Sequence, residues 1–291
     1  MKLNFLIVGD WGRKGTPGQR SVAAGMARIA KRFESRFVVT TGDNFYDHGV
    51  SSLDDAHWRE SFENVYTSPA LQIPWYIVLG NHDYQGCIQA QLDYTKTHPR
   101  WRLPARYHAV EYAIDATANA LLVFLDTTPF VASYRAESPE FMESLKDQNP
   151  EVQCAWLRKT LSVSKAACKL VFGHHPIYSA SPFHGDTLEL QDGLLPLLHE
   201  YGVQAYICGH EHDLQHLVVD GVDYIVCGAG AEWRTTGWRD HSRCSASTLG
   251  FSAVSLTSDC LYVDFYNDQG RRLYSLEKPL EPLAKAVALN A

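Results

Sequence analysis

Short, continuous apolar runs recur along the first two thirds of the chain, and each is closed by a glycine. They are rich in Val, Ile, Phe and Tyr, and they occupy residues 3–8, 37–40, 75–79, 170–172 and 205–208. An uninterrupted apolar run that ends at glycine is typical of a strand buried on both faces. We therefore expect five buried strands.

Helical periodicity lies between these runs. Val22, Met26, Ile29 and Phe33 recur at helical spacing, and residues 156, 157 and 161 repeat the pattern. Residues 213–226 instead alternate and turn at an Asp-Gly pair, which predicts a hairpin. Further strands are expected to begin near Ala120, Val222, Phe251 and Leu261. Strands that alternate with helices in this way indicate an α/β fold.

Each of the five runs leads into a short motif of metal-binding residue types. The motifs read GDWG (9–12), GDNFY (42–46), GNHD (80–83), GHH (173–175) and GHEH (209–212). The ligand crevice of an open α/β sheet lies outside the carboxyl ends of its strands, so these strand ends are expected to meet. One such Asp or His is usually a turn, surface or core residue, but turn chemistry does not explain all five. Together they predict a site for two metal ions that hydrolyses phosphate esters.

The order and content of the motifs resemble the calcineurin-like metallophosphoesterases. Tyr46, three residues after Asp43, distinguishes the purple acid phosphatases among them, and the resemblance is to their small, mammalian-type, tartrate-resistant group. It extends to GDNFYDHGV, GNHDY, RWRLPARYH, AYICGHEHDLQH and GAGAEW, and it covers roughly residues 3–274. It implies a four-layer α/β/β/α sandwich of two packed mixed sheets flanked by helices.

The resemblance also implies a ligand set for two ions. A ferric ion would be held by Asp10, Tyr46 and His212, with Asp43 bridging to a second ion that is Fe(II), Zn or Mn. That second ion would be completed by Asn81, His174 and His210. Ligand chemistry agrees, because phenolate and carboxylate suit Fe(III) whereas imidazole and amide suit a softer divalent ion.

The choice between His174 and His175 stays open at this level. The two are adjacent, and the sequence does not show which imidazole faces inward. The spacing from Val171 favours His174.

Two further histidines are candidates for catalysis. His82 matches the family's non-ligating catalytic histidine and is expected to bond the substrate phosphate. His184 is expected to protonate the leaving alkoxide. Its spacing from His174 is one residue longer than in the family, and Phe183 stands where mammalian members carry an acidic residue, so an exposed loop histidine is the alternative. No arrangement of Ser or Cys predicts a covalent intermediate, and hydroxide activated by the metals is the expected nucleophile.

Three more polar residues near the motifs have alternative interpretations. His216 follows His212 by four residues and is expected to lie around the site or on the surface rather than on a metal. Asp83 and Asp213 each follow a motif histidine and either accept its ring N–H or cap a helix.

Composition limits the partners. The chain has 291 residues, of which 45% are apolar, and no linker, repeat or low-complexity run interrupts it, which predicts a single domain over residues 1–291. A net charge of −7 argues against a broad nucleic-acid-binding face. Arginines at 100, 102 and 106 and at 234, 239 and 243 are expected at the surface, although the first group could border a phosphate pocket. No apolar run is long enough to span a membrane.

The compartment follows from the N-terminus and the cysteines. Residues 3–8 are too short for a signal-peptide core and lead straight into Asp10. Mammalian-type relatives are secreted or lysosomal and carry a disulfide, but this chain has no cysteine from 126 to 153 or from 178 to 207. Its seven cysteines predict buried free thiols in a cytoplasmic protein. Removal of a leader would make a secreted or periplasmic location the alternative.

Residues 127–153 replace the exposed regulatory loop of the family. Three prolines and several acids predict an irregular lid over the site that influences substrate size. The expected function is hydrolysis of phosphate monoesters by a monomer that acts on small phosphorylated substrates or phosphopeptides. A phosphodiesterase or nucleotide-hydrolysing phosphoesterase with the same metals is the alternative, and a metal-free scaffold is a third.

Overall fold

Two seven-stranded sheets form the centre of the protein. The computed structural model describes residues 2–280. The first sheet has the order β14-β13-β12-β1-β2-β3-β4, and its β1 to β4 half is parallel. Its strands are β1 (Leu3–Val8), β2 (Val38–Thr40), β3 (Trp75–Tyr76), β4 (Trp101–Arg102), β12 (Gly250–Leu256), β13 (Cys260–Asn267) and β14 (Arg272–Pro279).

The second sheet has the order β11-β9-β10-β8-β7-β6-β5. Strands β6, β7, β8 and β10 are parallel to one another, and antiparallel strands close both edges. Its strands are β5 (His108–Ala113), β6 (Asn119–Phe124), β7 (Cys168–Phe172), β8 (Ala205–Cys208), β9 (Leu214–Val219), β10 (Val222–Cys227) and β11 (Ser242–Ala246).

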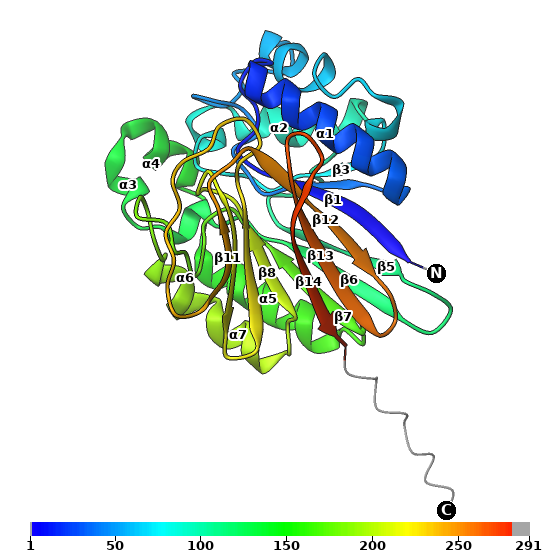
Figure 1. Ribbon diagram of the computed structural model, residues 1–291. Coiled ribbons are helices and arrows are strands. Elements are labelled where there is room, and N and C mark those ends of the chain that lie inside the picture. Colours follow the sequence, from blue (N-terminus) through cyan, green and yellow to red (C-terminus); the bar gives the residue numbers. More distant parts are fainter. Residues whose placement is uncertain (1, 281–291) are drawn as a thin grey trace, which may run out of the picture.

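Helices cover the outer face of each sheet, so the molecule has four layers. Figure 1 shows α1 and α2 over the first sheet and α5, α6 and α7 over the second. The α-helices are α1 (Pro17–Phe33), α2 (Ile88–Thr97), α3 (Tyr134–Glu137), α4 (Pro139–Leu145), α5 (Pro150–Val163), α6 (Leu188–Gly193) and α7 (Leu195–Glu200). The expected four-layer sandwich is confirmed.

Strand β1 shows why the apolar runs are continuous. Its alternate residues Phe5 and Ile7 pack between the two sheets, whereas Leu6 and Val8 pack outward against α1. Because successive side chains of a strand point to opposite faces, a strand covered on both sides must be apolar at every position. The runs at 3–8 and 205–208 match β1 and β8 residue for residue, while the run at 75–79 yields only the two-residue β3.

Residues 127–153 were expected to be irregular, and that part of the prediction was wrong. The segment contains a 3₁₀ turn (η4, Thr128–Phe130), α3, α4 and the start of α5. Ser138 and Asn149 cap the last two helices with their side chains, and proline opens each helix. Phe141 and Leu145 of α4 join the core beside the first sheet.

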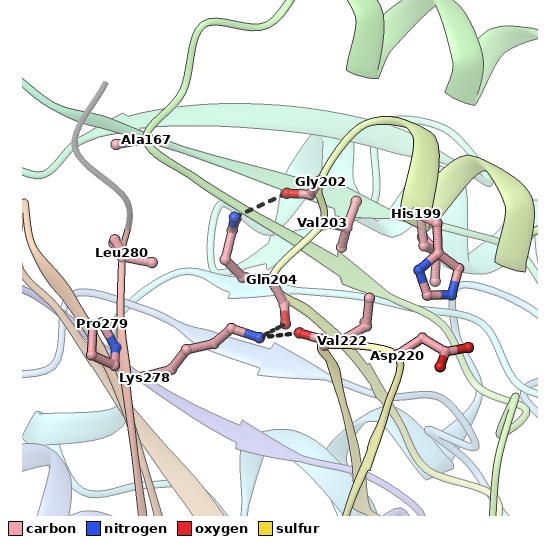
Figure 2. Close-up of a pocket in the computed structure, with 12 residues that line it drawn as sticks. Ala167, His199, Gly202, Val203, Gln204, Asp220, Val222, Lys278, Pro279 and Leu280 are labelled. Atoms are coloured by element: carbon pink, nitrogen blue, oxygen red, sulfur yellow. Dashed lines mark hydrogen bonds between the residues drawn. The ribbon is translucent and has the colours of Figure 1, made fainter. Parts of the chain in front are cut away.

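A pocket of about 430 Å³ lies at the end of the second sheet where strands β7, β8 and β10 begin (Figure 2). Lys278 crosses it and donates to the carbonyl oxygens of Gln204 (3.1 Å) and Gly221 (2.6 Å). The motif residues follow the opposite ends of β7 and β8, so this pocket is separate from them.

The cysteines and the membrane-spanning potential of the helices can be compared with the expectations from composition. All seven cysteines are free thiols, and four of them are buried. Within residues 2–280, none of the helices has both the length and the apolar character needed to cross a membrane.

Candidate metal centre

The motif residues leave their strands through unusual backbone conformations. Asp10, Asp43 and His210 have φ values of 57°, 49° and 70°, in the left-handed region that is unfavourable for side chains other than glycine. Two glycines pack against these carboxylates in space. A Cβ on Gly80 would lie 2.2 Å from Asp43 Oδ1, and one on Gly209 would lie 2.4 Å from Asp10 Oδ2, so neither position has room for a side chain. Backbone strain of this kind persists where the surrounding structure enforces it, and it gathers at functional sites.

The first group of side chains surrounds the hydroxyl of Tyr46. That oxygen lies 2.9 Å from Asp10 Oδ1, 2.8 Å from Asp43 Oδ2 and 3.1 Å from His212 Nε2. The four residues come from three motifs that are far apart in the sequence, and all are buried. The backbone N–H of His210 donates to Asp10 Oδ2 at 3.0 Å and links this group to the next.

The second group surrounds Nε2 of His174. This atom lies 3.0 Å from Asn81 Oδ1, 3.2 Å from His210 Nδ1 and 3.4 Å from Asp43 Oδ1. The other ring nitrogen of His174 is 2.8 Å from the carbonyl oxygen of Thr41, which can only accept a hydrogen bond. His174 Nδ1 therefore carries the proton, and Nε2 directs its lone pair into the site.

The donor set fits metal ions better than it fits hydrogen bonding. The lone pair of His174 Nε2 faces the carboxylate of Asp43 and the amide oxygen of Asn81, and neither oxygen has a proton to give. The single hydroxyl proton of Tyr46 likewise faces oxygens of two carboxyl groups and a ring nitrogen. Several lone pairs that converge without protons are what a cation requires of its ligands.

The electrostatics of the site agree with this. Burial raises the pKa of Asp10 well above its usual range, and the nearby charge of Asp43 adds to the shift. Burial also raises the pKa of the Tyr46 phenol and lowers the pKa of His212 to about 3. A cation bound among these groups would offset the repulsion and displace their protons. The ligand atoms of Asp10, Asp43 and His174 all lie within 4.8 Å of one another. The same holds for the ligand atoms of His174, His175 and His210.

His175 lies beside this group, but its ring nitrogens have other partners. Nδ1 is 2.9 Å from the hydroxyl of Thr127, and Nε2 is 3.0 Å from the hydroxyl of Tyr134. The Thr127 oxygen already accepts from the backbone N–H groups of His174 and His175, so its own proton is directed at Nδ1. This arrangement leaves His175 without a free lone pair and favours His174 as the inward-facing imidazole.

Both candidate catalytic histidines lie at the rim of the site. His82 Nε2 is 4.0 Å from Asp43 Oδ2, while His82 Nδ1 is held by the carbonyl oxygen of Asp47 at 2.6 Å. The ring of His184 lies 4.2 Å from that of His210 between centroids, and its side chain is 44% exposed. The longer spacing before His184 does not keep it from the site.

Several residues of the site were not found from the sequence. Glu211 lies between two motif histidines, and its carboxylate accepts from the backbone N–H groups of His184 (3.1 Å) and Gly185 (3.0 Å). Its place inside the GHEH motif was a usable signal. Arg13, whose guanidinium lies over the Tyr46 ring, and Tyr134 gave no such signal, because their roles depend on contacts with distant segments.

Asp83 and Asp213 do not orient the histidines that precede them. The carboxylate of Asp83 accepts from the backbone N–H groups of Asn44 and Gly80, so it fixes two motif loops against each other. That of Asp213 accepts from Gln215 Nε2, and Nδ1 of His212 has no hydrogen-bond partner among the described residues.

His216 lies away from this cluster on β9. Its ring is buried, with Nε2 2.7 Å from Asp223 Oδ1 and Nδ1 2.9 Å from the Tyr274 hydroxyl. It therefore joins strands of the two sheets.

Among the basic residues, Arg100 pairs with Glu63 at 2.9 Å, and Arg106 donates to the Tyr84 hydroxyl at 2.8 Å.

Comparisons with known proteins decide the family. Residues 3–214 match the calcineurin-like phosphoesterase family. Purple acid phosphatase 4 of Arabidopsis thaliana is 39% identical over 284 residues, which cover 94% of this chain and 82% of the relative. The chain belongs to the purple acid phosphatases. Tartrate-resistant acid phosphatase type 5 of Homo sapiens is 33% identical over 95% of this chain and 91% of the relative.

Solved structures share the architecture of this purple acid phosphatase. The structure described as "GAP50 the anchor in the inner membrane complex of Plasmodium" matches with a TM-score of 0.86 and 26% identity, and the match covers 96% of this chain and 89% of that chain. A purple acid phosphatase from yellow lupin, Lupinus luteus, matches with a TM-score of 0.69 and 14% identity over 95% of this chain and 53% of its own. The second likeness concerns the fold alone.

Proposed function

We propose that this purple acid phosphatase is a dinuclear-metal enzyme that hydrolyses phosphate monoesters. Its support is the convergence of the motif side chains on two adjacent centres, where lone pairs outnumber the protons that could lie between them. We further propose that residues 1–291 act as one domain and as a monomer. The substrates would be small phosphorylated molecules or phosphopeptides, and the cytoplasm remains our expectation for its location.

Each centre would hold one ion. Asp43 would bridge, because one of its oxygens faces the Tyr46 hydroxyl and the other faces His174. When bound, such a pair of ions supplies Lewis acidity and an activated water. The first centre, with its phenolate and carboxylates, suits Fe(III), and the second suits Fe(II), Zn or Mn. The first would be held by Asp10, Asp43, Tyr46 and His212, and the second by Asp43, Asn81, His174 and His210.

We propose that His82 binds the transferred phosphoryl group. Its Nδ1 donates to the carbonyl oxygen of Asp47, which fixes the ring and directs Nε2 towards Asp43. A ring held at the rim in this way would, when it carries a proton on each nitrogen, donate its Nε2–H to a phosphate oxygen and orient the ester for attack.

We propose that His184 protonates the leaving alkoxide. Its Nδ1 lies 3.3 Å from Glu211 Oε2, and this buried carboxylate can accept the Nδ1–H of a ring that carries a proton on each nitrogen. Nε2 would then carry the proton that the departing oxygen needs. Glu211 also accepts hydrogen bonds from two backbone N–H groups of the His184 loop, so it positions that loop as well as the ring.

A covalent phosphoenzyme is not part of the proposal. The thiol closest in sequence to the motifs is that of Cys208, which is buried, and burial raises its pKa well above the usual range. A thiol of this kind is a poor nucleophile because the thiolate is the reactive form.

The deciding experiment combines metal analysis with a visible spectrum of the purified protein. Iron together with a second metal, and a phenolate-to-Fe(III) charge-transfer band that gives a purple colour, are expected. Hydrolysis of p-nitrophenyl phosphate should exceed that of bis-p-nitrophenyl phosphate at mildly acidic pH. A colourless protein without iron, or one that prefers the diester, would refute the assignment.

The similarity to an anchor protein favours one other candidate. The GAP50 structure is described as an anchor in a membrane complex, and it shares the fold with a TM-score of 0.86. A metal-free scaffold of this fold is expected to have lost ligands, whereas every residue of the set proposed here is present. Metal analysis separates the two, since a scaffold would purify without stoichiometric metal.

A further inference from the structure

Arg13 makes a close contact with the phenol ring at the centre of the site. It directly follows the GDWG motif, and its guanidinium carbon lies 3.7 Å from the centroid of the Tyr46 ring. This separation is well within the range of about 6 Å for a cation over an aromatic face. The side chain is only 17% exposed, so little water competes with the contact.

Two carboxylates hold the guanidinium in this position. Nη1 of Arg13 lies 3.5 Å from Asp47 Oδ1, and Nη2 lies 3.1 Å from Glu232 Oε2. Asp47 directly follows Tyr46, whereas Glu232 comes from the loop after β10. Their side chains are 70% and 52% exposed, so solvent screens these two charges more than it screens the cation against the ring. A planar fork with two anchored ends suits arginine and not lysine.

We propose that Arg13 is a positioning residue that fixes the Tyr46 ring and tunes the electronic state of the iron bound to it. The inference rests on the proposed function, in which Tyr46 is a ferric ligand. A cation over the ring attracts its π electrons and stabilises them. Transfer of an electron from phenolate to Fe(III) then needs more energy. The added positive charge also favours the ferrous over the ferric state.

A purely structural role for Arg13 would be a clamp between loops. Such a clamp predicts that neutral substitutions lower stability but leave the spectrum of the iron centre unchanged. Spectroscopy therefore separates the two roles, whereas activity alone does not.

The test uses the metal-loaded protein. Arg13→Gln and Arg13→Met remove the charge, and Met keeps an unbranched side chain over the ring if Gln disturbs folding. Both variants should move the charge-transfer band to longer wavelength by about 10 nm or more, a shift consistent with an interaction of the cation–π class. Both should also lower the Fe(III)/Fe(II) midpoint potential. Arg13→Lys should give a smaller shift in the same direction.

Arg234→Gln is the matched control. Its backbone N–H donates to the carbonyl oxygen of His212 at 2.7 Å, but its guanidinium lies over Phe183 at 5.5 Å and not over Tyr46. It therefore removes an equal charge near the same centre without changing the phenol contact, and its band should stay at the wild-type position. A common shift in all variants would identify a general charge effect and would overturn the specific role of Arg13.

The outcomes separate the inference from the function beneath it. An unchanged band in both neutral Arg13 variants, at wild-type iron content, would overturn the inference and leave the phosphatase assignment intact. A wild-type protein that contains iron but lacks the band would instead remove the assignment of Tyr46 on which the inference rests.

Discussion

Tyr46 is the side chain at which the chemistry of the first metal position is decided. Its hydroxyl is within 3.1 Å of oxygens from Asp10 and Asp43 and of a nitrogen of His212. Burial holds its pKa well above the usual value, so the phenolate forms only if a strong positive charge replaces the proton. Only a metal ion at this position would give that charge directly to the oxygen.

The substitution Tyr46→Phe should therefore bleach the protein. It removes the phenolate donor but keeps the buried ring, so the purple band should disappear while the far-ultraviolet circular dichroism stays unchanged. The measurement is the visible spectrum of wild type and variant at equal protein concentration, with iron analysis of both. A band that persists in the variant would show that another ligand is responsible for the colour.

His184 leads to a prediction about leaving groups. Proton donation matters most when the departing alkoxide is strongly basic, as from an alkyl phosphate, and least for p-nitrophenolate. His184→Asn should lower kcat for an alkyl phosphate by roughly 100-fold, within the usual range for general acid catalysis, and for p-nitrophenyl phosphate by much less. Steady-state kinetics with both esters provide the test. An equal loss for the two substrates would indicate that His184 binds or positions phosphate.

Residue-level interpretation of the sequence worked where a strand end fixes the side chain. Asp10 and His210 directly follow glycines that end buried strands, so the fold itself brings them together. Asp83 was interpreted by its sequence neighbour, whereas its real partners are Asn44 and Gly80, which the spacing along the chain does not reveal. Arg13 was missed for the same reason.

Helix α3 connects residues 127–153 to the metal centre. Tyr134 at its start bonds His175 Nε2, and its ring stacks on Phe141 of α4 with centroids 5.0 Å apart. Thr127, the first residue of this segment, lies 2.9 Å from the other ring nitrogen of His175. The segment is therefore tied to the site through one histidine, next to His174.

Loss of this tie should loosen the segment and change substrate selection. Tyr134→Ala removes both the hydrogen bond and the stacked ring, so we expect faster proteolytic cleavage within residues 131–149 and an altered KM for bulky esters. Tyr134→Phe keeps the ring and loses only the hydrogen bond, at about 1 kcal/mol, so it should resemble wild type in cleavage rate. Limited proteolysis and kinetics with a small and a large ester provide the comparison.

One result would contradict this expectation. If Tyr134→Ala matches wild type in both cleavage rate and KM across the esters, α3 has no part in controlling access. Equal effects of Ala and Phe would instead assign the whole effect to the hydrogen bond with His175.

At the level of elements, the sequence predicted the buried strands and α1 but not α3 and α4. Long apolar patterns decide structure because burial outweighs local preference, whereas four- to seven-residue helices are unstable alone and depend on tertiary contacts. A signal for α4 was nevertheless present, since Ser138 and the proline after it form a typical helix start. The prolines were interpreted as marks of an irregular loop, although at the first helical position proline is favourable.

Across the whole molecule, several carboxyl groups are buried, and not all of them belong to the metal centre. Asp126 follows β6, and burial raises its pKa to about 7. One carboxyl oxygen accepts from the Tyr84 hydroxyl, which in turn accepts from Arg106, while the other has no partner among the described residues. A carboxyl group in this position couples the stability of the fold to pH.

The sign of that coupling follows from the direction of the shift. Because the pKa of Asp126 is higher in the folded state (about 7) than in the unfolded state (3.8), the folded protein binds more protons between these values. The stabilising contribution is complete below about pH 4 and is lost as the pH rises towards 7. Its slope reaches at most about 1.4 kcal/mol per pH unit. Asp126→Asn keeps the shape of the side chain and cannot ionise, so it should flatten this part of the stability profile.

Urea unfolding of wild type and Asp126→Asn at intervals from pH 4 to 7 measures the effect. The wild-type free energy of unfolding should fall relative to that of the variant as the pH rises, because only the wild type must take up a buried charge. Asp54→Asn, at an exposed position, is the control and should follow the wild-type profile. Parallel profiles for wild type and Asp126→Asn would mean that Asp126 is charged throughout this range, stabilised by Arg106 through Tyr84. The pH dependence of folding would then have to come from other buried carboxyl groups, such as Asp83 and Asp213, whose pKa values burial raises to about 7.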